Sequence, residues 1–471
     1  MTSTRSSPRR NPSPAGHSVA LVSLGCPKNL VDSELMLAGL VRSGFEVKGS
    51  IEEADIAVLN TCSFLESARR EAEQWVEEAV RLKRAGRLKA VIVAGCLPAI
   101  MGKKLLDKFP EVDAIVGPRD RLKVAKACAA SVGSPAGRRI FLSGSDALVR
   151  AVHPRAVSTG RHTAYLKISE GCDNRCAYCL IPRIRGKLIS RTMGSVLREA
   201  ELLARDGVRE LCLVAQDTTA YGIDLYGRPV LHELLRRLEV VEGLNWVRLL
   251  YAHPARWSDE LTEVLRDGPN LCKYADVPIQ HVSDRMLRLM RRRVRKKKLV
   301  ETLEKIRGAV PEISLRTTVM VGFPGEGEAE FSELLEFLGD FQFDHVGAFS
   351  YSREPGTPAA SLPGQVSRRV KEERLRQVME LQREISGRKN ASRAGSRVAV
   401  LLDRVETGGT RGTGRTEGQA PEIDSVVHVT GRGLREGQFC EVRIVGSAEY
   451  ELFAEAVSLT RRPRPSTRRD R

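Results

Sequence analysis

The stretch that decides the fold is Thr163–Cys179, "TAYLKISEGCDNRCAYC". It begins as an apolar run typical of a buried strand and ends in three closely spaced cysteines, Cys172, Cys176 and Cys179. Their spacing fits neither a zinc ribbon nor a ferredoxin, and no fourth cysteine follows nearby. Three thiolates can hold a [4Fe–4S] cube whose fourth iron stays open for chemistry. A structural metal knuckle is the alternative.

Five later apolar runs repeat the pattern of a strand followed by a helix. They read ELCLVAQ (210–216), WVRLLYA (246–252), KYADVPI (273–279), LRTTVMVG (315–322) and HVGAFSY (345–351). Together with the first run they predict a partial (β/α)6 barrel over residues 161–388. Active sites of such barrels lie at the C-terminal ends of the strands, which is where the three cysteines fall.

Residues 17–140 also alternate between strands and helices, which predicts a parallel α/β domain. The expected strands are SVALVSLG (18–25), ADIAVLNT (54–61), KAVIVAG (89–95) and DAIVG (113–117). The expected helices cover about 29–42, 67–82 and 99–108. A linker rich in Gly, Ser and Pro, around residues 133–160, separates this domain from the next.

Each of the first three strands of this domain ends in a cysteine, namely Cys26, Cys62 and Cys96. Ligands of open α/β sheets bind outside the carboxyl ends of the strands, so we expect these thiols to converge at one rim. Three small buried thiols are the alternative reading. The remaining cysteines are predicted to be core residues: Cys128, Cys212, Cys272 and Cys440.

The last domain, residues 389–460, changes to short β-like runs separated by Gly-rich turns. The runs are SRVAVLLDRV (396–405), SVVHVTG (425–431), QFCEVRIVG (438–446) and YELFAEAV (450–457). They predict a small antiparallel β-barrel of the oligonucleotide-binding kind. The two ends of the chain, 1–16 and 461–471, are expected to be disordered because they are rich in Arg, Ser and Pro.

Composition narrows the class of protein. The 471 residues carry a net charge of +17, which is concentrated in the two ends and in Arg285–Lys298. That distribution does not support a body that binds nucleic acid along its length. No apolar run is long enough to span a membrane, and no export signal is evident, so we expect a cytoplasmic protein. Ten cysteines in such a chain indicate metal binding or catalysis rather than disulfides.

GCDNRCAYC resembles the CxxxCxxC motif of the radical S-adenosylmethionine (SAM) enzymes. In that family SAM binds the open iron, and an electron from the cluster cleaves it to give a 5′-deoxyadenosyl radical. Over residues 18–460 the chain resembles the methylthiotransferases, which add an N-terminal cysteine domain and a C-terminal TRAM barrel. The resemblance implies a second [4Fe–4S] cluster on Cys26, Cys62 and Cys96, which carries the sulfur to be transferred.

Four stretches resemble the RimO-type methylthiotransferases, which modify an aspartate β-carbon of ribosomal protein S-twelve. They are SLGCPKNLVDSE (23–34), KISEGCDNRCAYCLIPRIRGKLISR (167–191), LVAQDTTAYG (213–222) and GQAPEIDSVVHV (418–429). A C–H bond of this kind has no useful acidity, so acid–base groups cannot activate it and a radical can. The C-terminal barrel, counted from Arg397 to Thr460, carries −3, which favours a basic protein over RNA as substrate.

The resemblance also implies partners and leaves an alternative open. Two molecules of SAM, a sulfur donor and an electron donor are implied, whereas no membrane or stable nucleic-acid partner is expected and a monomer is the default. The alternative substrate is an adenosine (C2) of transfer RNA. A non-catalytic ribosome-binding factor that carries clusters is a further alternative.

Other candidate residues are weaker, and none is assigned a catalytic role beyond the cluster ligands. Tyr178 lies between two ligands, where the family often places an aromatic side chain near adenine. The turn GFPGE resembles a cofactor-contact loop, although it could be a plain strand-to-helix turn. The residues predicted to contact the cofactor are Tyr178, Gln216, Gly322, Phe323, Pro324, Gly325 and Glu326. Asp217, His253 and Gln280 also end strands. The basic run Arg285–Lys298 could touch ribosomal RNA or form a solvated helix face.

Overall fold

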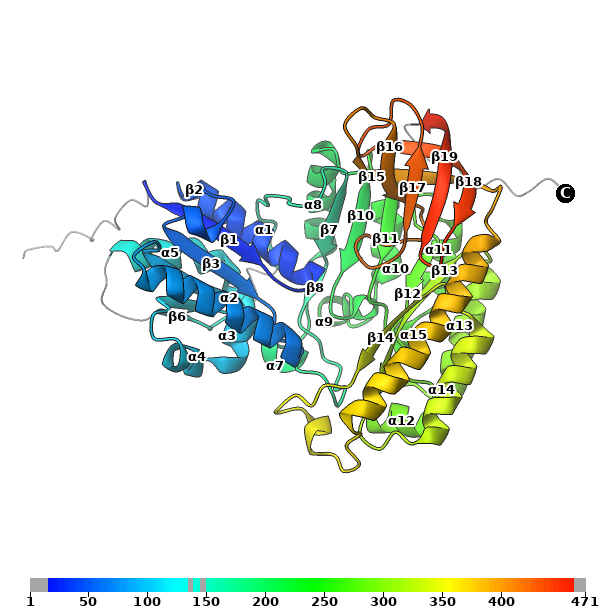
Figure 1. Ribbon diagram of the computed structural model, residues 1–471, viewed down its shortest axis with the longest axis horizontal. Helices are drawn as coiled ribbons and strands as arrows, with labels where there is room; N and C mark the ends of the chain where they lie inside the picture. The colour runs from blue at the N-terminus through cyan, green and yellow to red at the C-terminus, as the bar shows by residue number, and fades with distance from the viewer. Residues whose placement is uncertain (1–15, 134–138, 145–149, 461–471) are drawn as a thin grey trace, which may run out of the picture. The chain divides into compact units, whose positions relative to one another are not determined.

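The computed structural model describes residues 16–133, 139–144 and 150–460 (Figure 1). The segments predicted to be disordered, 1–16 and 461–471, lie outside these residues apart from Gly16. Contacts divide the chain into two compact units. The first unit takes Met1–Val157 and Ile181–Gly186, and the second takes Ser158–Leu180 and Lys187–Arg471. The short segment Ile181–Gly186 is therefore part of the first unit, although its neighbours on both sides belong to the second.

The first unit is built on a parallel sheet with the strand order β2-β1-β3-β4-β5-β6. The strands are β1 (Ser18–Ser23), β2 (Glu46–Val47), β3 (Ile56–Thr61), β4 (Ala90–Gly95), β5 (Ala114–Val116) and β6 (Arg139–Phe141). The four strands that the sequence predicted are confirmed. The edge strands β2 and β6 were not predicted, because two or three residues are too few to show a periodic pattern.

Helices cover both faces of this sheet (Figure 1). The helices of this unit are α1 (Pro27–Arg42), α2 (Glu66–Arg84), α3 (Cys96–Met101), α4 (Lys103–Lys108), α5 (Val124–Gly133) and α7 (Ile181–Ile184), with 3-10 turns η1 (Ile51–Glu53) and η2 (Pro118–Lys123). Helices α1 and α5 pack on one face, and α2, α3 and α4 pack on the other. Alternate residues of β3 and β4 serve the two cores, so both strands are buried throughout.

The single helix predicted over residues 99–108 is wrong. The structure has two short helices, α3 and α4, which are separated by Gly102 with φ 55° and ψ −133°. The first of them begins at Cys96, directly after β4. The backbone at Gly102 lies outside the helical region, so one continuous helix cannot form.

The second unit contains the six predicted strands of a partial barrel. They are β7 (Thr163–Lys167), β10 (Glu210–Val214), β11 (Trp246–Leu249), β12 (Tyr274–Asp276), β13 (Ser314–Val321) and β14 (His345–Ser350). They form two parallel three-stranded groups, β7-β10-β11 and β12-β13-β14, joined by a parallel bridge between Val247 and Leu271. The predicted order of βα units is confirmed. A small antiparallel pair, β8 (Ser169–Glu170) and β9 (Ile189–Ser190), flanks the cysteine loop.

Helices follow the strands of the partial barrel in turn. They are α8 (Met193–Arg205), α9 (Ile223–Tyr226), α10 (Leu231–Glu239), α11 (Asp259–Asp267), α12 (Asp284–Leu289), α13 (Lys296–Ala309), α14 (Glu328–Phe341) and α15 (Arg368–Ala391), with 3-10 turns η3 (Thr218–Ala220), η4 (Pro254–Arg256) and η5 (Pro358–Ser361). Side-chain oxygens of Thr192, Ser258 and Ser367 cap α8, α11 and α15. None of the described helices is both long enough and apolar enough to cross a membrane.

The C-terminal domain is a closed barrel, as predicted, with the strand order β15-β16-β17-β19-β18. The strands are β15 (Arg397–Val405), β16 (Arg411–Arg415), β17 (Val426–Thr430), β18 (Phe439–Ser447) and β19 (Glu451–Thr460). All pairs are antiparallel except β17 with β19. The sequence missed β16, which reads RGTGR and lacks apolar alternation. Packing requires a glycine at position 414, because a Cβ at Gly414 would lie 2.3 Å from the carbonyl oxygen of Leu401.

This barrel is joined to the N-terminal ends of the partial-barrel strands by buried ion pairs. Glu210 begins β10, and its two carboxylate oxygens bind Arg248 of β11 at 2.8 Å and Arg415 of β16 at 2.6 Å. The three side chains are almost fully buried. Burial alone would raise the pKa of Glu210, but the charges of Arg415 and Arg248 outweigh it and lower the pKa.

Further contacts join the same two surfaces. Asp424 binds Arg316 of β13 at 3.3 Å and accepts a hydrogen bond from Tyr274 of β12 at 2.7 Å. Asp403 lies 3.1 Å from the ring nitrogen of His162, the residue before β7. These partners lie at or near the N-terminal ends of the strands, so the C-terminal barrel covers the end of the partial barrel opposite to its predicted active site.

We expect Glu210→Ala to lower the free energy of unfolding by about 3–5 kcal/mol, because it leaves two buried arginines without their shared carboxylate. Urea unfolding followed by circular dichroism measures this cost. The matched control is Glu455→Ala, which removes an exposed carboxylate from the pair with Arg443 and should change stability little. Equal losses in the two variants would show that the buried network does not hold the two domains together.

Candidate functional site

The first cysteine triad lies at the carboxyl ends of three adjacent strands. Cys26 follows β1 and caps α1, Cys62 directly follows β3, and Cys96 directly follows β4. Because β1, β3 and β4 are neighbours in the sheet, the three thiols gather at one rim, as the sequence predicted. The loops approach closely: Gly25 has φ 91°, and a Cβ on it would lie 2.6 Å from the Cβ of Cys62.

Burial and charge act on these thiols in different ways. Burial raises the pKa of Cys96 to about 12, and burial together with the nearby Cys26 raises that of Cys62. Burial would also raise the pKa of Cys26, but the charges of Lys28 and Arg185 outweigh it and lower the pKa. The three thiols interact electrostatically with one another, and all three interact with the cation Arg185, so they form one site.

That cation, Arg185, is a functional candidate that the sequence analysis missed. It follows α7 in the segment that returns to the first unit, and its side chain is 1% exposed. Its guanidinium lies 3.0 Å from Asp32, 3.3 Å from the side-chain oxygen of Asn29 and 3.6 Å from the sulfur of Cys96. Arg185 lies in the RimO-like stretch 167–191, but no spacing rule connects an arginine after the second triad with a cysteine of the first, so the sequence did not single it out.

The second triad occupies the loop after β8. The backbone NH of Asn174 approaches the sulfur of Cys172 at 3.4 Å, and the NH of Cys179 donates to the carbonyl of Cys176 at 3.2 Å. Burial raises the pKa of Cys172 to about 11, and the negative charge of Asp217 adds to the increase. The three cysteines thus lie on one loop, at the strand ends where the sequence predicted an active site.

A polar junction fixes this loop to the neighbouring strand ends. The side-chain NH of Asn174 donates to Asp217 at 2.7 Å, and Arg256 donates to Asn174 at 2.8 Å and to Asp217 at 2.9 Å. Asp217 follows β10 and Arg256 lies in η4, so three successive βα loops meet at Asn174. Asp217, one of the weaker candidates from sequence, therefore positions the cysteine loop.

A buried arginine also approaches the second triad. One terminal nitrogen of Arg292 lies 3.9 Å from the sulfur of Cys176, and the other donates to the carbonyl of Pro278 at 2.5 Å. The carbonyl of Met290 accepts a hydrogen bond from the NH of Ala177 at 2.9 Å. The chain after α12 is thereby held against the cysteine loop.

Both donor sets fit the chemistry of a [4Fe–4S] cluster, because each offers three thiols on one rim or one loop, with a buried arginine against one of the sulfurs. In the described part of the chain no three His, Cys, Asp or Glu side chains are arranged to hold a single metal ion. The cysteines of a cube need not converge on one atom, because each binds its own iron.

Several of the predicted cofactor contacts lie beside the second triad. Tyr178 packs edge-on against Phe323 with ring centroids 6.5 Å apart, and both adjoin the small core formed with Ala177 and Met290. Phe323 belongs to the turn after β13 that includes Pro324. The structure thus brings Tyr178 and the GFPGE turn together, although they are far apart in the sequence.

The carboxylate of Glu326 stabilises the GFPGE turn itself. One oxygen accepts hydrogen bonds from the NH of Gly322 at 2.8 Å and from Arg374 of α15 at 2.7 Å. The other oxygen lies 3.6 Å from the ring of the fully buried His281. The NH of Gly325 donates to the carbonyl of Gly364 at 2.8 Å. Glu326 therefore has a clear structural role.

The remaining candidates lie at strand ends but have different surroundings. Gln216 is half-buried next to Asp217 after β10. His253 is buried and accepts a hydrogen bond from the NH of Ala255, and burial together with Arg292 and Arg256 lowers its pKa to about 2, so it is neutral. Gln280 extends the pairing of β12 with β13 through its backbone. The predicted core cysteines, Cys128, Cys212, Cys272 and Cys440, are confirmed as fully buried.

Three family models match successive parts of the chain. They are an uncharacterized protein family, UPF0004, over residues 18–117, the radical SAM superfamily over 166–338 and a TRAM domain over 394–457. The ribosomal protein uS12 methylthiotransferase RimO of Pelotomaculum thermopropionicum is 46% identical and aligns with 94% of this chain and 100% of that protein. The RimO of Desulforamulus reducens is 45% identical over 93% of this chain and 99% of that protein.

The chain belongs to the RimO methylthiotransferase family. It is a radical SAM transferase, and this family implies a [4Fe–4S] cluster and SAM as cofactors.

Solved structures support the same fold. TsrM, a radical SAM methyltransferase from Kitasatospora setae solved with cobalamin and a [4Fe–4S] cluster, has a TM-score of 0.55 at 17% identity, over 73% of this chain and 77% of that one. OxsB, a cobalamin-dependent radical SAM enzyme, has a TM-score of 0.51 at 12% identity, over 78% of this chain and 56% of that one. At these identities the likeness concerns the fold alone.

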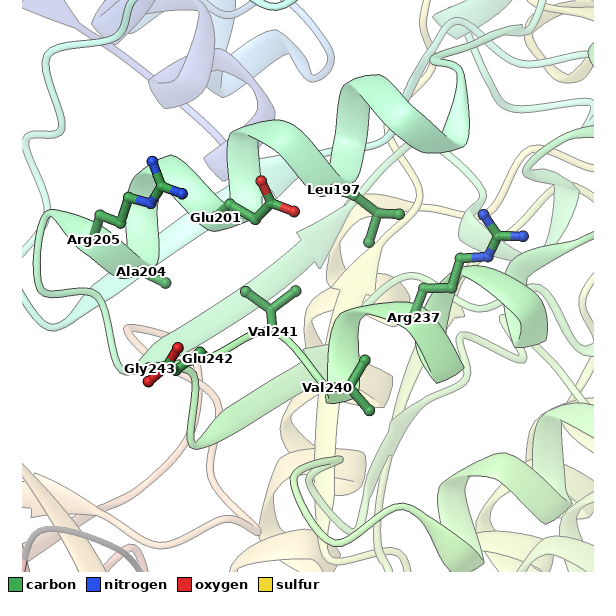
Figure 2. Close-up of a pocket in the computed structure, with 9 residues that line it drawn as sticks. All are labelled: Leu197, Glu201, Ala204, Arg205, Arg237, Val240, Val241, Glu242 and Gly243. Atoms are coloured by element: carbon green, nitrogen blue, oxygen red, sulfur yellow. The ribbon is translucent and has the colours of Figure 1, made fainter.

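A hollow of about 660 Å³ lies elsewhere on this RimO-family chain, between the ends of α8 and α10 (Figure 2). Its lining mixes charged and aliphatic side chains: Leu197, Glu201, Ala204, Arg205, Arg237, Val240, Val241, Glu242 and Gly243. It contains no cysteine and none of the predicted cofactor contacts. It opens beside the C-terminal ends of two helices, whereas barrel active sites lie at the C-terminal ends of strands.

We expect Asn174→Ala to loosen the cysteine loop, because it removes the amide that joins this loop to Asp217 and Arg256. Hydrogen exchange with mass spectrometry should show faster exchange of backbone amides in residues 172–180. The control is Arg175→Ala, which removes an exposed neighbour and should leave the exchange unchanged. Unaltered exchange in Asn174→Ala would contradict the anchoring role.

Proposed function

We propose that this chain adds a methylthio group to the β-carbon of an aspartate in ribosomal protein uS12, using two molecules of SAM and two [4Fe–4S] clusters. The observation that carries the proposal is the pair of cysteine triads, each gathered at the carboxyl ends of parallel strands in a RimO-family chain. In this proposal Cys26, Cys62 and Cys96 hold one cluster, and Cys172, Cys176 and Cys179 hold the other.

The second triad would hold the cluster that binds SAM and supplies a 5′-deoxyadenosyl radical for hydrogen abstraction. Asn174 fixes the loop that carries this triad. Tyr178, which packs on the fully buried Phe323, provides an apolar wall for an adenine ring, which aromatic side chains favour. Gly322 and Gly325 have no Cβ, so the backbone at this turn can approach the cofactor closely. Gln216 offers a side-chain amide at the end of β10. These roles follow from position and chemistry.

The first triad would hold the cluster that carries the sulfur. Arg185 brings a positive charge next to Cys96, and its pairing with Asp32 keeps that charge in place. A buried cation favours thiolate over thiol, so Arg185 favours the state in which the cysteines bind iron. The residue thus acts through the ligands as a positioning residue.

A transfer RNA adenosine is the second candidate substrate. The net charge of −3 counted over the C-terminal barrel is weak support for a protein substrate, because several of the counted residues contact the partial barrel. Four of its acids and its Arg415 face the partial barrel; the acids are Asp403, Glu417, Glu422 and Asp424. Without these five residues the barrel carries no net charge. The ribosomal-protein substrate therefore rests on the named relatives, not on this charge.

The same proposal sets the partners and the compartment. A ribosomal protein substrate favours a cytoplasmic enzyme, and the reaction requires a sulfur donor and an electron donor. A monomer suffices, because both triads are supplied by one chain. Neither a membrane nor a stable nucleic-acid partner is required by this chemistry.

The substrate is tested with reduced, cluster-loaded enzyme, SAM, sulfide and uS12, followed by mass spectrometry of the protein. The expected product is uS12 heavier by one methylthio group on an aspartate. The control is the Cys172→Ala variant, which should produce neither modified protein nor 5′-deoxyadenosine. If the enzyme forms 5′-deoxyadenosine but leaves uS12 unmodified, uS12 is not the substrate. If transfer RNA from a deletion strain lacks methylthioadenosine, the transfer RNA adenosine is supported instead.

The number of clusters is tested by iron and sulfide analysis of reconstituted protein. The wild type should bind about eight irons, and a Cys26→Ala/Cys62→Ala/Cys96→Ala variant should bind about four, as should the equivalent variant of the second triad. The matched control replaces two buried cysteines outside the triads, Cys128→Ala/Cys440→Ala, and should keep the full amount. About four irons in the wild type would exclude the second cluster.

A further inference from the structure

A surface of unpaired cations adjoins the second cysteine triad. We name it the basic surface, and its six exposed members are Arg288, Arg291, Arg293, Arg295, Lys297 and Lys298. Within the described ranges none of the six forms an ion pair, whereas the nearby acids Glu330 and Glu333 are paired with Arg285 and Lys296. The basic surface therefore presents to solvent six positive charges that form no ion pair in the described part of the chain.

The burial pattern shows that the basic surface and the contacts with the cysteine loop lie on opposite sides of one segment. From Met290 to Arg295 buried and exposed residues alternate strictly. The buried members include Met290, which binds the NH of Ala177, and Arg292, which approaches the sulfur of Cys176. The exposed members are Arg291, Arg293 and Arg295. The segment therefore contacts the cysteine loop with one side and faces solvent with the other.

Folding does not account for Lys297 and Lys298 at the start of α13, whereas Lys296 is paired with Glu333. Lys296, Lys297 and Lys298 fill the first turn of this helix, and no acid lies in that turn. The helix dipole favours anions there, so lysines at this end act against stability. Only the backbone NH of Lys296 is satisfied locally, by Asp284 at 2.7 Å. Such a placement indicates that the charge serves binding.

We propose that the basic surface docks a small acidic protein that delivers one electron to the cluster on Cys172, Cys176 and Cys179. The inference rests on the proposed function, which requires that cluster to be reduced. Complexes between redox partners are small, transient and steered by opposite charge, which fits a compact patch of unpaired cations. The position beside the Cys176 loop makes the path from donor to cluster short.

An RNA backbone would also be attracted by these charges, but two observations favour the redox protein. The segment 284–298 contains no aromatic side chain, and single-stranded RNA is commonly bound by stacking its bases on aromatic rings. The direct contact with the cysteine loop has no use in binding RNA, whereas an electron donor must approach this loop.

The electron transfer balances with a reduced flavoprotein as the donor class. A flavin hydroquinone loses one electron and becomes the semiquinone, and the cluster gains that electron and passes from the 2+ to the 1+ state. No atom is transferred between the two proteins. Dithionite, a small reductant, can supply the same electron without docking.

The test uses the cluster-loaded full chain as wild type and as Arg293→Glu/Lys297→Glu. The second substitution puts an acid where the dipole of α13 favours it, so this variant should fold at least as well as the wild type. The matched control is Arg205→Glu/Arg237→Glu, which changes the net charge equally at the hollow between α8 and α10 (Figure 2). The probe is flavodoxin, an acidic protein that carries a flavin.

Two readouts are compared for each form. Titration with flavodoxin at low salt should give a dissociation constant raised about tenfold or more in Arg293→Glu/Lys297→Glu and unchanged in the control. The rate of 5′-deoxyadenosine formation should fall when photoreduced flavodoxin is the reductant and stay at the wild-type value with dithionite.

Each contrary result has a distinct meaning. Unchanged flavodoxin affinity would overturn the inference, and so would an equal loss in the control. Unchanged affinity together with lost binding to ribosomes would identify the basic surface as an RNA contact instead. Absence of 5′-deoxyadenosine from wild-type enzyme with dithionite would reject the proposed function, while the titration would still decide whether the surface binds the acidic protein.

Discussion

Glu210 is a carboxylate buried between Arg248 and Arg415, and it holds the C-terminal barrel against the first residues of the partial-barrel strands. Burying a charge is costly unless its partners are in place, so the three side chains can be satisfied only when both domains have folded and met. This contact covers the N-terminal ends of the strands and leaves the C-terminal ends for the cysteine loop. The position of the site thus depends on an interaction at the opposite end of the barrel.

Repetition made much of the architecture predictable. Six apolar runs with helical segments between them indicated the partial barrel, and cysteines after successive strands indicated a shared rim. The places where prediction failed share a physical cause. The strands β2 and β6 are too short to show a period, β16 is kept in place by glycines rather than by apolar residues, and the break at Gly102 depends on a backbone conformation that a helical pattern does not reveal.

Side chains that act on the site from a distance in sequence were the least predictable part. Arg185 reaches Cys96, and Arg292 reaches Cys176, through folding of segments that no motif connects with those cysteines. Glu326 shows the converse: its motif drew attention to a cofactor, while its carboxylate binds Gly322 and Arg374. A motif identifies which residues matter, but the contacts decide what each of them does.

The passage of Ile181–Gly186 into the first unit has an evolutionary consequence. Asp32 of that unit is paired with Arg185, 153 positions away and beyond the whole linker. An N-terminal domain exchanged between homologues at the linker would arrive without its own arginine and would have to accept one from a foreign partner. The two units are therefore separate folds that cannot be exchanged independently between homologues. Substitutions at Asp32 are constrained by Arg185, which is encoded beyond the linker.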